Sequence, residues 1–195
     1  MCTKKKYGLI ALIIVILLIV CNYCFNHLLI KGDLCEESPF YKVFYDEDRK
    51  LYSYQIFSTN GDKIDEVRNI SGNLYVELIS DSLLHAIIGS GSNSSQEWFY
   101  DIKNNRKSEE FFNISAIHDS TIVYMEFTDD YEIRLIIRDI FDTEVLYKEI
   151  IRDFSKTAVA STDLKNVTFI NDKTIEVEYA IGSNYEIVKE IIMLE

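Results

Sequence analysis

Residues able to perform acid–base or nucleophilic chemistry are few in this chain, which has three histidines among its 195 residues. His118 is followed directly by Asp119 and Ser120, the three residue types of a serine hydrolase triad. A triad needs its base, its orienting acid and its nucleophile to converge from separate segments, which three consecutive residues cannot do. We therefore expect residues 118–120 to form a turn. His85 lies in an apolar run, and we expect a strand histidine that faces solvent or is satisfied in place.

Metal ligands and phosphate-binding patterns are equally sparse. After His27 the chain has one cysteine and two histidines, too few for a zinc cage. The acidic clusters at residues 46–48 and 129–130 lack the calcium-loop pattern, so we expect solvated turns there. The glycine- and serine-rich segment 89–95 fits neither a nucleophile elbow nor a phosphate loop, but it is the best position for a binding loop. The sequence thus predicts no catalytic, cofactor-binding or metal-ligating residue.

The N-terminal segment carries the strongest signal. Lys4, Lys5 and Lys6 precede an apolar run that starts at Tyr7, and the next charged residue is Lys31. About twenty apolar residues in a helix cross a hydrocarbon core roughly 30 Å thick. We expect a basic cytoplasmic segment at 1–6, a transmembrane helix at 7–30 and a juxtamembrane linker at 31–39. A cleaved signal or a lipoprotein signal is the alternative, but the run is too long and no small-residue cleavage site follows it.

Charge sets the expected orientation and excludes one class of partner. Three lysines precede the helix, so the N-terminus is predicted to be cytoplasmic and residues 40–195 to form one extracytoplasmic domain in a single-pass cell-membrane protein. All 32 acidic residues lie after residue 32, whereas four of the 20 basic residues precede it, which leaves the outer part at a formal charge of −16. Such a surface repels phosphate backbones, so nucleic-acid binding is not expected.

Cys35 is the single cysteine of the predicted outer part, so the fold is not expected to depend on an intrachain disulfide. A free thiol is the expectation, and a bridge between two anchored copies is the alternative. Four N-x-[ST] sequons would accept glycans in a eukaryotic secretory pathway, and they lie at Asn69, Asn93, Asn113 and Asn166.

Alternating side chains predict an all-β domain. In residues 131–138, Tyr131, Ile133, Leu135 and Ile137 share one face, and residues 174–179 alternate in the same way with Ile175, Val177 and Tyr179 inward. Two further segments, 145–151 and 187–192, fit a helix face as well as a strand, and strands are expected. Residues 153–161 do not alternate and are expected to form a loop or one helical turn. About ten to twelve strands are expected in total.

Polar turn pairs punctuate these runs, and three of them recur at a regular distance. Asn60-Gly61 suits a type I′ turn, which needs positive φ at both positions. Residues 54–61, 98–105 and 137–143 each run from strand into turn, spaced by about 44 and then about 38 residues, near the period of four-stranded propeller blades. In this respect the chain resembles β-propeller repeats, although no signature motif identifies a family. An open β-meander, propeller-like blades and a sandwich are the possible architectures.

From these features the sequence predicts a membrane-anchored extracytoplasmic β-domain that acts as a non-enzymatic binding module for a protein partner of unknown identity. Two alternatives stay open. One is a carboxylate-based hydrolase of envelope or extracellular polymer, because sequence does not reveal the separations among 32 acids. The other is a structural subunit of a membrane complex whose helix packs against other membrane helices.

Overall fold

The computed structural model describes residues 30–194 apart from residues 90, 92–93, 143 and 156–158. The predicted basic segment 1–6 and all but the last residue of the predicted helix 7–30 lie outside the described residues. In the described part, no helix has the length and apolarity needed to cross a bilayer. The segment 31–39, expected to be a linker, contains strand β1 (Asp33–Glu37), so the β-structure begins earlier than predicted.

The described chain is all-β, as predicted, and is arranged in four antiparallel sheets that follow one another along the sequence. Sheet A holds β1 with β2 (Tyr41–Asp46), β3 (Leu51–Phe57) and β4 (Lys63–Ile70). Sheet B holds β5 (Asn73–Leu78), β6 (Leu83–Gly89), β7 (Ser95–Asp101), β8 (Arg106–Lys107) and β9 (Phe111–Phe112).

The second half of the chain repeats this arrangement. Sheet C holds β10 (Ile114–His118), β11 (Thr121–Phe127), β12 (Ile133–Asp139) and β13 (Leu146–Ile151). After a short 3-10 helix, η1 (Ala160–Asp163), sheet D holds β14 (Leu164–Asn171), β15 (Thr174–Ile181) and β16 (Glu186–Met193). Within each sheet the strands pair mainly with their neighbours in sequence, because short hairpin connections favour antiparallel pairing.

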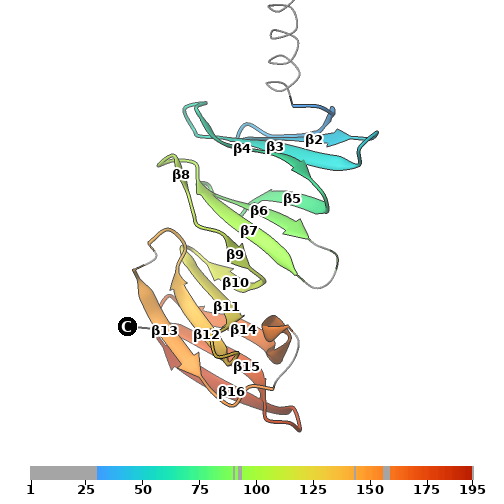
Figure 1. Cartoon of the computed structure of the whole chain (residues 1–195). Helices are drawn as coiled ribbons and strands as arrows, with labels where there is room; N and C mark the ends of the chain where they lie inside the picture. The colour runs from blue at the N-terminus through green and yellow to red at the C-terminus, as the bar shows by residue number, and fades with distance from the viewer. Residues whose placement is uncertain (1–29, 90, 92–93, 143, 156–158, 195) are drawn as a thin grey trace, which may run out of the picture.

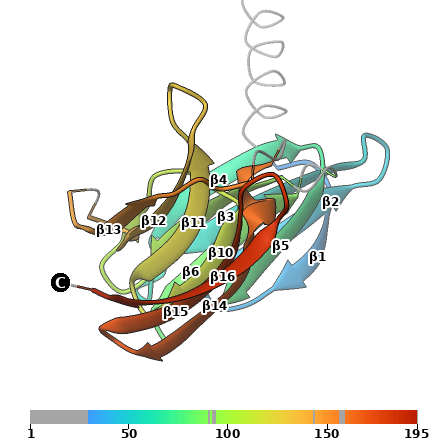
Figure 2. The ribbon, with the colours of Figure 1, turned by 90° about the horizontal axis from the view of Figure 1, so that it is seen from below.

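Three cores of buried side chains join the sheets in chain order. The first lies between sheets A and B, the second between B and C, and the third between C and D. Figures 1 and 2 show the sheets lying over one another as a stack. Among the described residues, no core cluster joins sheet A to sheet D, so the stack is open. The two middle sheets bury both faces, which accounts for the apolar runs in β6 and β11.

One backbone hydrogen bond recurs in every sheet. A residue at or just after the end of the third strand donates its N–H to the carbonyl of the residue just before the second strand. The four N···O distances are 2.8, 3.0, 2.8 and 2.8 Å, for the pairs Phe57–Phe40, Ile102–Ser82, Ile140–Ser120 and Leu194–Lys173. The sheets are therefore repeats of one unit, and β3, β7, β12 and β16 are its equivalent third strands. The repeated strand-to-turn segments found in the sequence fall on the first three of these.

Most local predictions are confirmed. The two ambiguous segments are strands β13 and β16, and η1 begins within the segment expected to be a loop or helical turn. Ile175, Val177 and Tyr179 are buried, as are Ile133, Leu135 and Ile137, each set on one strand face.

Three expectations are corrected. Tyr131 does not share the buried face of β12; its side chain is 83% exposed and its φ is +60°, because the strand begins two residues later. The Asn60-Gly61 connection has positive φ at Gly61 but not at Asn60, since five residues separate β3 from β4 and a two-residue type I′ turn does not form. The described residues form sixteen strands, more than expected, because short strands such as β8 and β9 carry no alternation signal.

Candidate functional site

A buried polar network in sheet B contains the histidine that the sequence placed on a strand. His85 in β6 is 3% exposed, and its Nε2 lies 2.8 Å from Oε2 of Glu97 in β7. The imidazole stacks on Phe99 with ring centroids 4.4 Å apart. His85 is thus buried with one ring nitrogen satisfied in place, which corresponds to the second of the two predicted outcomes for that nitrogen only. Its Nδ1 is buried without a hydrogen-bond partner and lies 3.6 Å from a carboxylate oxygen of Glu77.

Glu97 uses both carboxylate oxygens inside the protein. Its Oε1 accepts hydrogen bonds from the Ser95 hydroxyl (2.5 Å) and from the backbone N–H of Ile114 in β10 (3.0 Å). The order is therefore serine, carboxylate, histidine, with the carboxylate in the middle. A hydrolytic triad needs the histidine to contact the serine, so this arrangement does not activate a nucleophile. It ties sheet B to the first strand of sheet C.

The glycine- and serine-rich segment 89–95 joins β6 to β7, and its residues 90 and 92–93 lie outside the described residues. Beside it lies an open pocket of about 450 Å³ lined by small polar residues, among them Gly91, Ser95, Asn113 and Ser161. The Asn113 side-chain oxygen accepts the backbone N–H of Ser95 at 2.8 Å. The predicted binding loop therefore adjoins a pocket, and among the described residues Ile114 is the one large apolar side chain in its lining.

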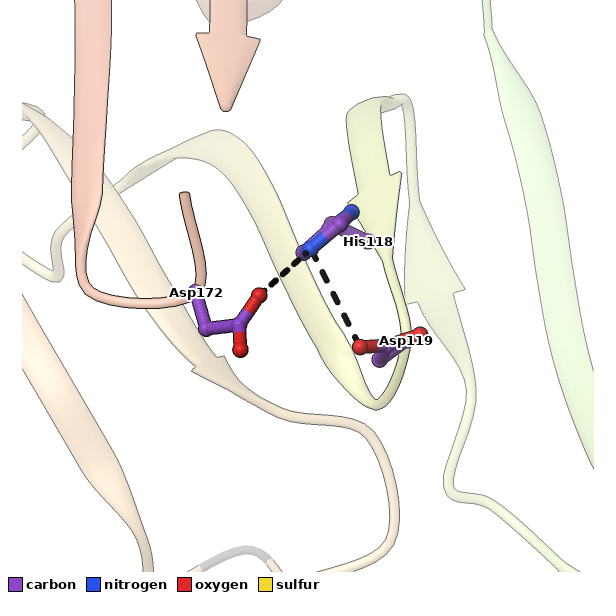
Figure 3. A group of neighbouring side chains, drawn as sticks. All are labelled: His118, Asp119 and Asp172. Atoms are coloured by element: carbon purple, nitrogen blue, oxygen red, sulfur yellow. Dashed lines mark hydrogen bonds and ion pairs between the residues drawn. The ribbon is translucent and has the colours of Figure 1, made fainter. Parts of the chain in front are cut away.

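His118 is drawn together with two carboxylates at the junction of sheets C and D (Figure 3). Its Nε2 lies 3.3 Å from Oδ1 of Asp172 and 3.8 Å from Oδ2 of Asp119, and its ring stacks on Phe169. Imidazole and carboxylate are ligands for several divalent metals. Both aspartate side chains are more than four-fifths exposed on hairpin turns, so the geometry fits a surface ion pair between two sheets. Ser120 donates its hydroxyl to Asp139 rather than to His118, and the predicted turn is confirmed.

A second buried network links sheets A and B. The Tyr100 hydroxyl donates to Asp65 Oδ2 at 2.7 Å and accepts from the Tyr54 hydroxyl at 2.8 Å. Lys107 pairs with the same Asp65 oxygen at 2.7 Å and lies over the Trp98 ring. Burial raises the pKa of Tyr54, and burial together with the neighbouring Tyr54 and Asp65 raises the pKa of Tyr100 further. Both phenols are held protonated, and the network is structural.

A pocket that was not foreseen from the sequence lies beside the start of β12 and the connection that follows β13. It encloses about 460 Å³ and is lined by aromatic and charged side chains, among them Phe127, Tyr131, Glu132, Arg152 and Phe154. A neighbouring pocket of about 390 Å³ shares Asp153 and Phe154 with it and adds Tyr185. Binding sites commonly combine apolar walls with a few charged groups. We name this region, with both pockets, the C–D groove.

An ion pair, a hydrogen bond and a β-bridge shape the C–D groove. Phe154 forms an isolated bridge to Ile181 and packs edge-on against Tyr179, with ring centroids 5.1 Å apart. Arg152 lies 3.2 Å from Glu190 in β16, and Tyr179 donates to the other oxygen of Glu190 at 2.5 Å. The guanidinium therefore connects the pocket wall to the last strand of sheet D. Burial, followed by the hydrogen bond to Glu190, raises the pKa of the Tyr179 phenol.

Sequence reasoning missed the C–D groove because its residues carry no motif. The alternation pattern placed Tyr131 in the core, Phe154 fell in the segment 153–161 expected to be a loop or one helical turn, and Arg152 directly precedes that segment. The positive φ of Tyr131 after Asp129-Asp130 marks a turn, and that polar pair was the available signal.

The remaining predicted features stand apart from the groove. The acidic clusters 46–48 and 129–130 lie at hairpin turns, as expected, and Asp46 accepts the backbone N–H of Arg49. Cys35 is an exposed free thiol in β1 that donates to the Val43 carbonyl, and burial and Glu36 raise its pKa. Of the sequon asparagines, Asn93 lies outside the described residues, and Asn69 and Asn113 have positive φ.

The chain was compared with models of known protein families, with curated proteins and with solved structures. None of the three comparisons found a match.

Proposed function

We propose that this protein is a membrane-anchored, extracytoplasmic binding module without enzymatic activity, which holds a protein partner at the end of the stack formed by sheets C and D. The observation that carries the proposal is the distribution of exposed apolar side chains. Among the residues that the structure describes, ten of the fifteen exposed large hydrophobic side chains lie after residue 113. Exposed apolar area that gathers in one region is typical of an interaction surface.

The C–D groove lies in the same part of the molecule and supports the assignment of the binding region to sheets C and D. Its aromatic walls include Tyr131, which is almost fully exposed although it is a large amphipathic side chain. Tyrosine and arginine are the residue types enriched at protein interfaces, and Arg152 stands beside it. A partner residue that entered the groove would meet both apolar contact area and a charged group.

The position of sheets C and D in the stack also favours them as the partner-binding region. The predicted anchor precedes sheet A in the chain, and sheets C and D lie at the opposite end of the stack (Figure 1). A partner in the extracytoplasmic space would thus meet these sheets without competition from the bilayer. The net negative charge of the outer part favours a partner with a basic surface.

We further infer that the four sheets are blades of propeller-like type rather than the layers of a sandwich. The recurring hydrogen bond from the third strand to the start of the second supports this, as does the meander order in every sheet. Rigid stacked units of this kind place their connecting loops on the surface, where binding sites commonly form.

A photocrosslinking experiment tests the binding proposal. A photoreactive amino acid at Tyr131 in the full-length protein, irradiated in native membranes, should join a protein partner that mass spectrometry identifies. The matched control places the same group at Asp48, an exposed turn residue of sheet A. Recovery of one partner through position 131 but not 48 supports the proposal. Equal recovery, or none at either site, contradicts it.

A further inference from the structure

The last strand of sheet D leaves a position open that the other sheets fill. The third strands β3, β7 and β12 each pair on one side with the second strand of their sheet and on the other with a fourth strand, β4, β8 or β13. The equivalent strand β16 pairs with β15 and, in the described part of the chain, with no strand on its other side. One backbone edge of β16 is thus available for pairing.

This edge is unusually regular. β16 pairs with β15 over eight successive residues without a register shift. Five of the other edge strands, β1, β4, β10, β13 and β14, carry register shifts, and β8 is two residues long. Bulges and short length are devices that prevent pairing at an edge. β5 is also regular but shorter, with six residues, which makes β16 the longest edge strand without a register shift among the described strands.

Exposed apolar side chains on β16 favour association at this edge. Ile187, Ile191 and Met193 lie on one face and are 54%, 63% and 75% exposed. Ile192, on the other face, is buried in the core between sheets C and D. An added strand would cover the exposed column, because side chains of neighbouring strands on one face lie about 5 Å apart.

Charges around β16 select the partner. Lys189 pairs with Glu176 at 2.7 Å, and Arg152 pairs with Glu190. These two cations stand against four carboxylates, which belong to Glu176, Glu178, Glu186 and Glu190. Two of these carboxylates lie on β15 and two on β16, and their excess of negative charge matches the sign of the whole outer part. A second β16 would bring the same excess of acid, so the charges favour a basic segment over a second copy.

We propose that β16 is a strand-addition site, at which an extended segment of the protein partner, with alternating apolar and basic side chains, pairs with the open backbone edge. Main-chain hydrogen bonds would supply affinity, and the column of Ile187, Ile191 and Met193 would supply specificity. This inference rests on the proposed binding function and names the binding mode.

The test uses full-length protein in detergent and a labelled eight-residue peptide in which valine and lysine alternate. Peptide binding should slow amide hydrogen exchange at alternate residues of β16. A peptide of the same composition with N-methylated backbone groups keeps the charge but cannot pair as a strand, so it should not slow exchange.

Matched variants locate the site. Ile191→Lys adds a cation beside the peptide lysines and should weaken binding about tenfold or more. Tyr75→Lys makes the same change at an exposed position of the regular edge strand β5 and should leave the affinity unchanged. Equal weakening by both variants, or binding without slowed exchange in β16, would overturn the proposal. So would slowed exchange in β16 that depends on protein concentration without peptide, since it would indicate a second copy as the occupant.

The two proposals can fail separately. If Ile191→Lys protein still crosslinks its partner through position 131 as well as the wild type does, the binding function stands and strand addition is wrong. If the wild type recovers no partner while the peptide pairs with β16, the strand-addition site stands and the proposed partner binding at the C–D groove is wrong.

Discussion

The phenolic oxygen of Tyr54 in β3 lies 2.8 Å from that of Tyr100 in β7, a hydrogen bond between residues 46 positions apart. Because Tyr100 donates its proton to Asp65, its oxygen must accept the proton of Tyr54. Both rings belong to the core between sheets A and B, so the pair carries a polar link through an apolar interface. Satisfied networks of this kind favour a single packing arrangement of the two sheets.

Tyr100→Phe should lower the free energy of unfolding by about 1–3 kcal/mol, because it leaves the buried Tyr54 hydroxyl without its acceptor. Tyr54→Phe removes one donor and leaves Tyr100 bonded to Asp65, so its cost should be about 1 kcal/mol or less. Urea denaturation followed by circular dichroism gives both values. A larger loss for Tyr54→Phe than for Tyr100→Phe would contradict the assigned donor order.

Alkaline stability should depend on the same pair. The pKa of Tyr54 and that of Tyr100 are raised above the ordinary value of 10.0, so both phenols bind protons more tightly in the folded chain. Their contribution to stability is complete below pH 10 and is lost as the pH rises above it. Absorbance of phenolate near pH 10 should therefore be the same in the wild type and in a Tyr54→Phe/Tyr100→Phe variant. A smaller absorbance step in the variant would show that these phenols ionise normally.

Glu66 should contribute to stability in acid. Burial raises the pKa of its carboxyl, but hydrogen bonds from Lys63, Gln55 and Arg68 outweigh burial and bring the pKa to about 2 from an ordinary 4.5. The folded chain thus binds this proton less tightly, and the contribution is complete above pH 4.5 and is lost as the pH falls toward 2. We expect the free energy of unfolding of the wild type to exceed that of Glu66→Gln by about 1 kcal/mol at pH 6, a value reduced for solvent screening. At pH 3 the difference in free energy should be smaller. A difference that is constant between pH 6 and pH 3 would exclude the effect.

Replacing Glu97 tests the link between sheets B and C. Glu97→Ala leaves His85 buried without its partner and removes the acceptor of the Ile114 amide, so it should cost about 3 kcal/mol or more. Glu97→Gln keeps an oxygen for Ile114 and an N–H toward His85, so the free energy of unfolding should fall by only about 1 kcal/mol. Chemical denaturation measures both losses. Equal losses would show that the hydrogen bonds to Glu97 contribute nothing measurable.

Gly72 should resist substitution more strongly than Gly61. It connects β4 to β5 with φ of +143°, and an added Cβ would lie 2.5 Å from the carbonyl oxygen of Gly89. Gly72→Ala should therefore cost more than the roughly 1 kcal/mol expected from positive φ alone. Gly61→Ala is the matched control, since Gly61 has φ of +84° and nothing lies within 4 Å of an added Cβ. Thermal melts compare the two variants, and similar decreases in melting temperature would rule out a steric clash at Gly72.

The fold could be predicted from local pattern to a considerable extent. Period-two alternation in residues 174–179 reflects a strand with one buried face, and the same logic identified most hairpin turns. Tyr131 shows the limit: it continues the alternation in the sequence, yet its backbone turns with positive φ before β12 begins. The alternation of apolar side chains predicts which residues a strand would bury. The hydrogen bonds of the preceding turn decide at which residue the strand starts.

The candidate site could not be predicted in the same way. Tyr131, Arg152 and Tyr185 come from three connections that have no pattern in common, and they lie together because sheet D packs on sheet C. The open edge of β16 is likewise invisible in the sequence, where residues 187–192 read as a strand like any other. Whether a strand edge is open depends on which other strands pair with it, and the local sequence of the strand does not encode those partners.

The sequence by itself determined the secondary structure class, a strand-to-turn repeat in three of the four sheets and the strongly acidic charge, because each of these depends on the order and composition of nearby residues. The tertiary structure decided that the sheets form an open stack, that Glu97 and Tyr100 are tied into buried networks, and that one regular edge and one aromatic groove lie at the same end. These depend on contacts between residues far apart in the chain, whose separations no local pattern encodes.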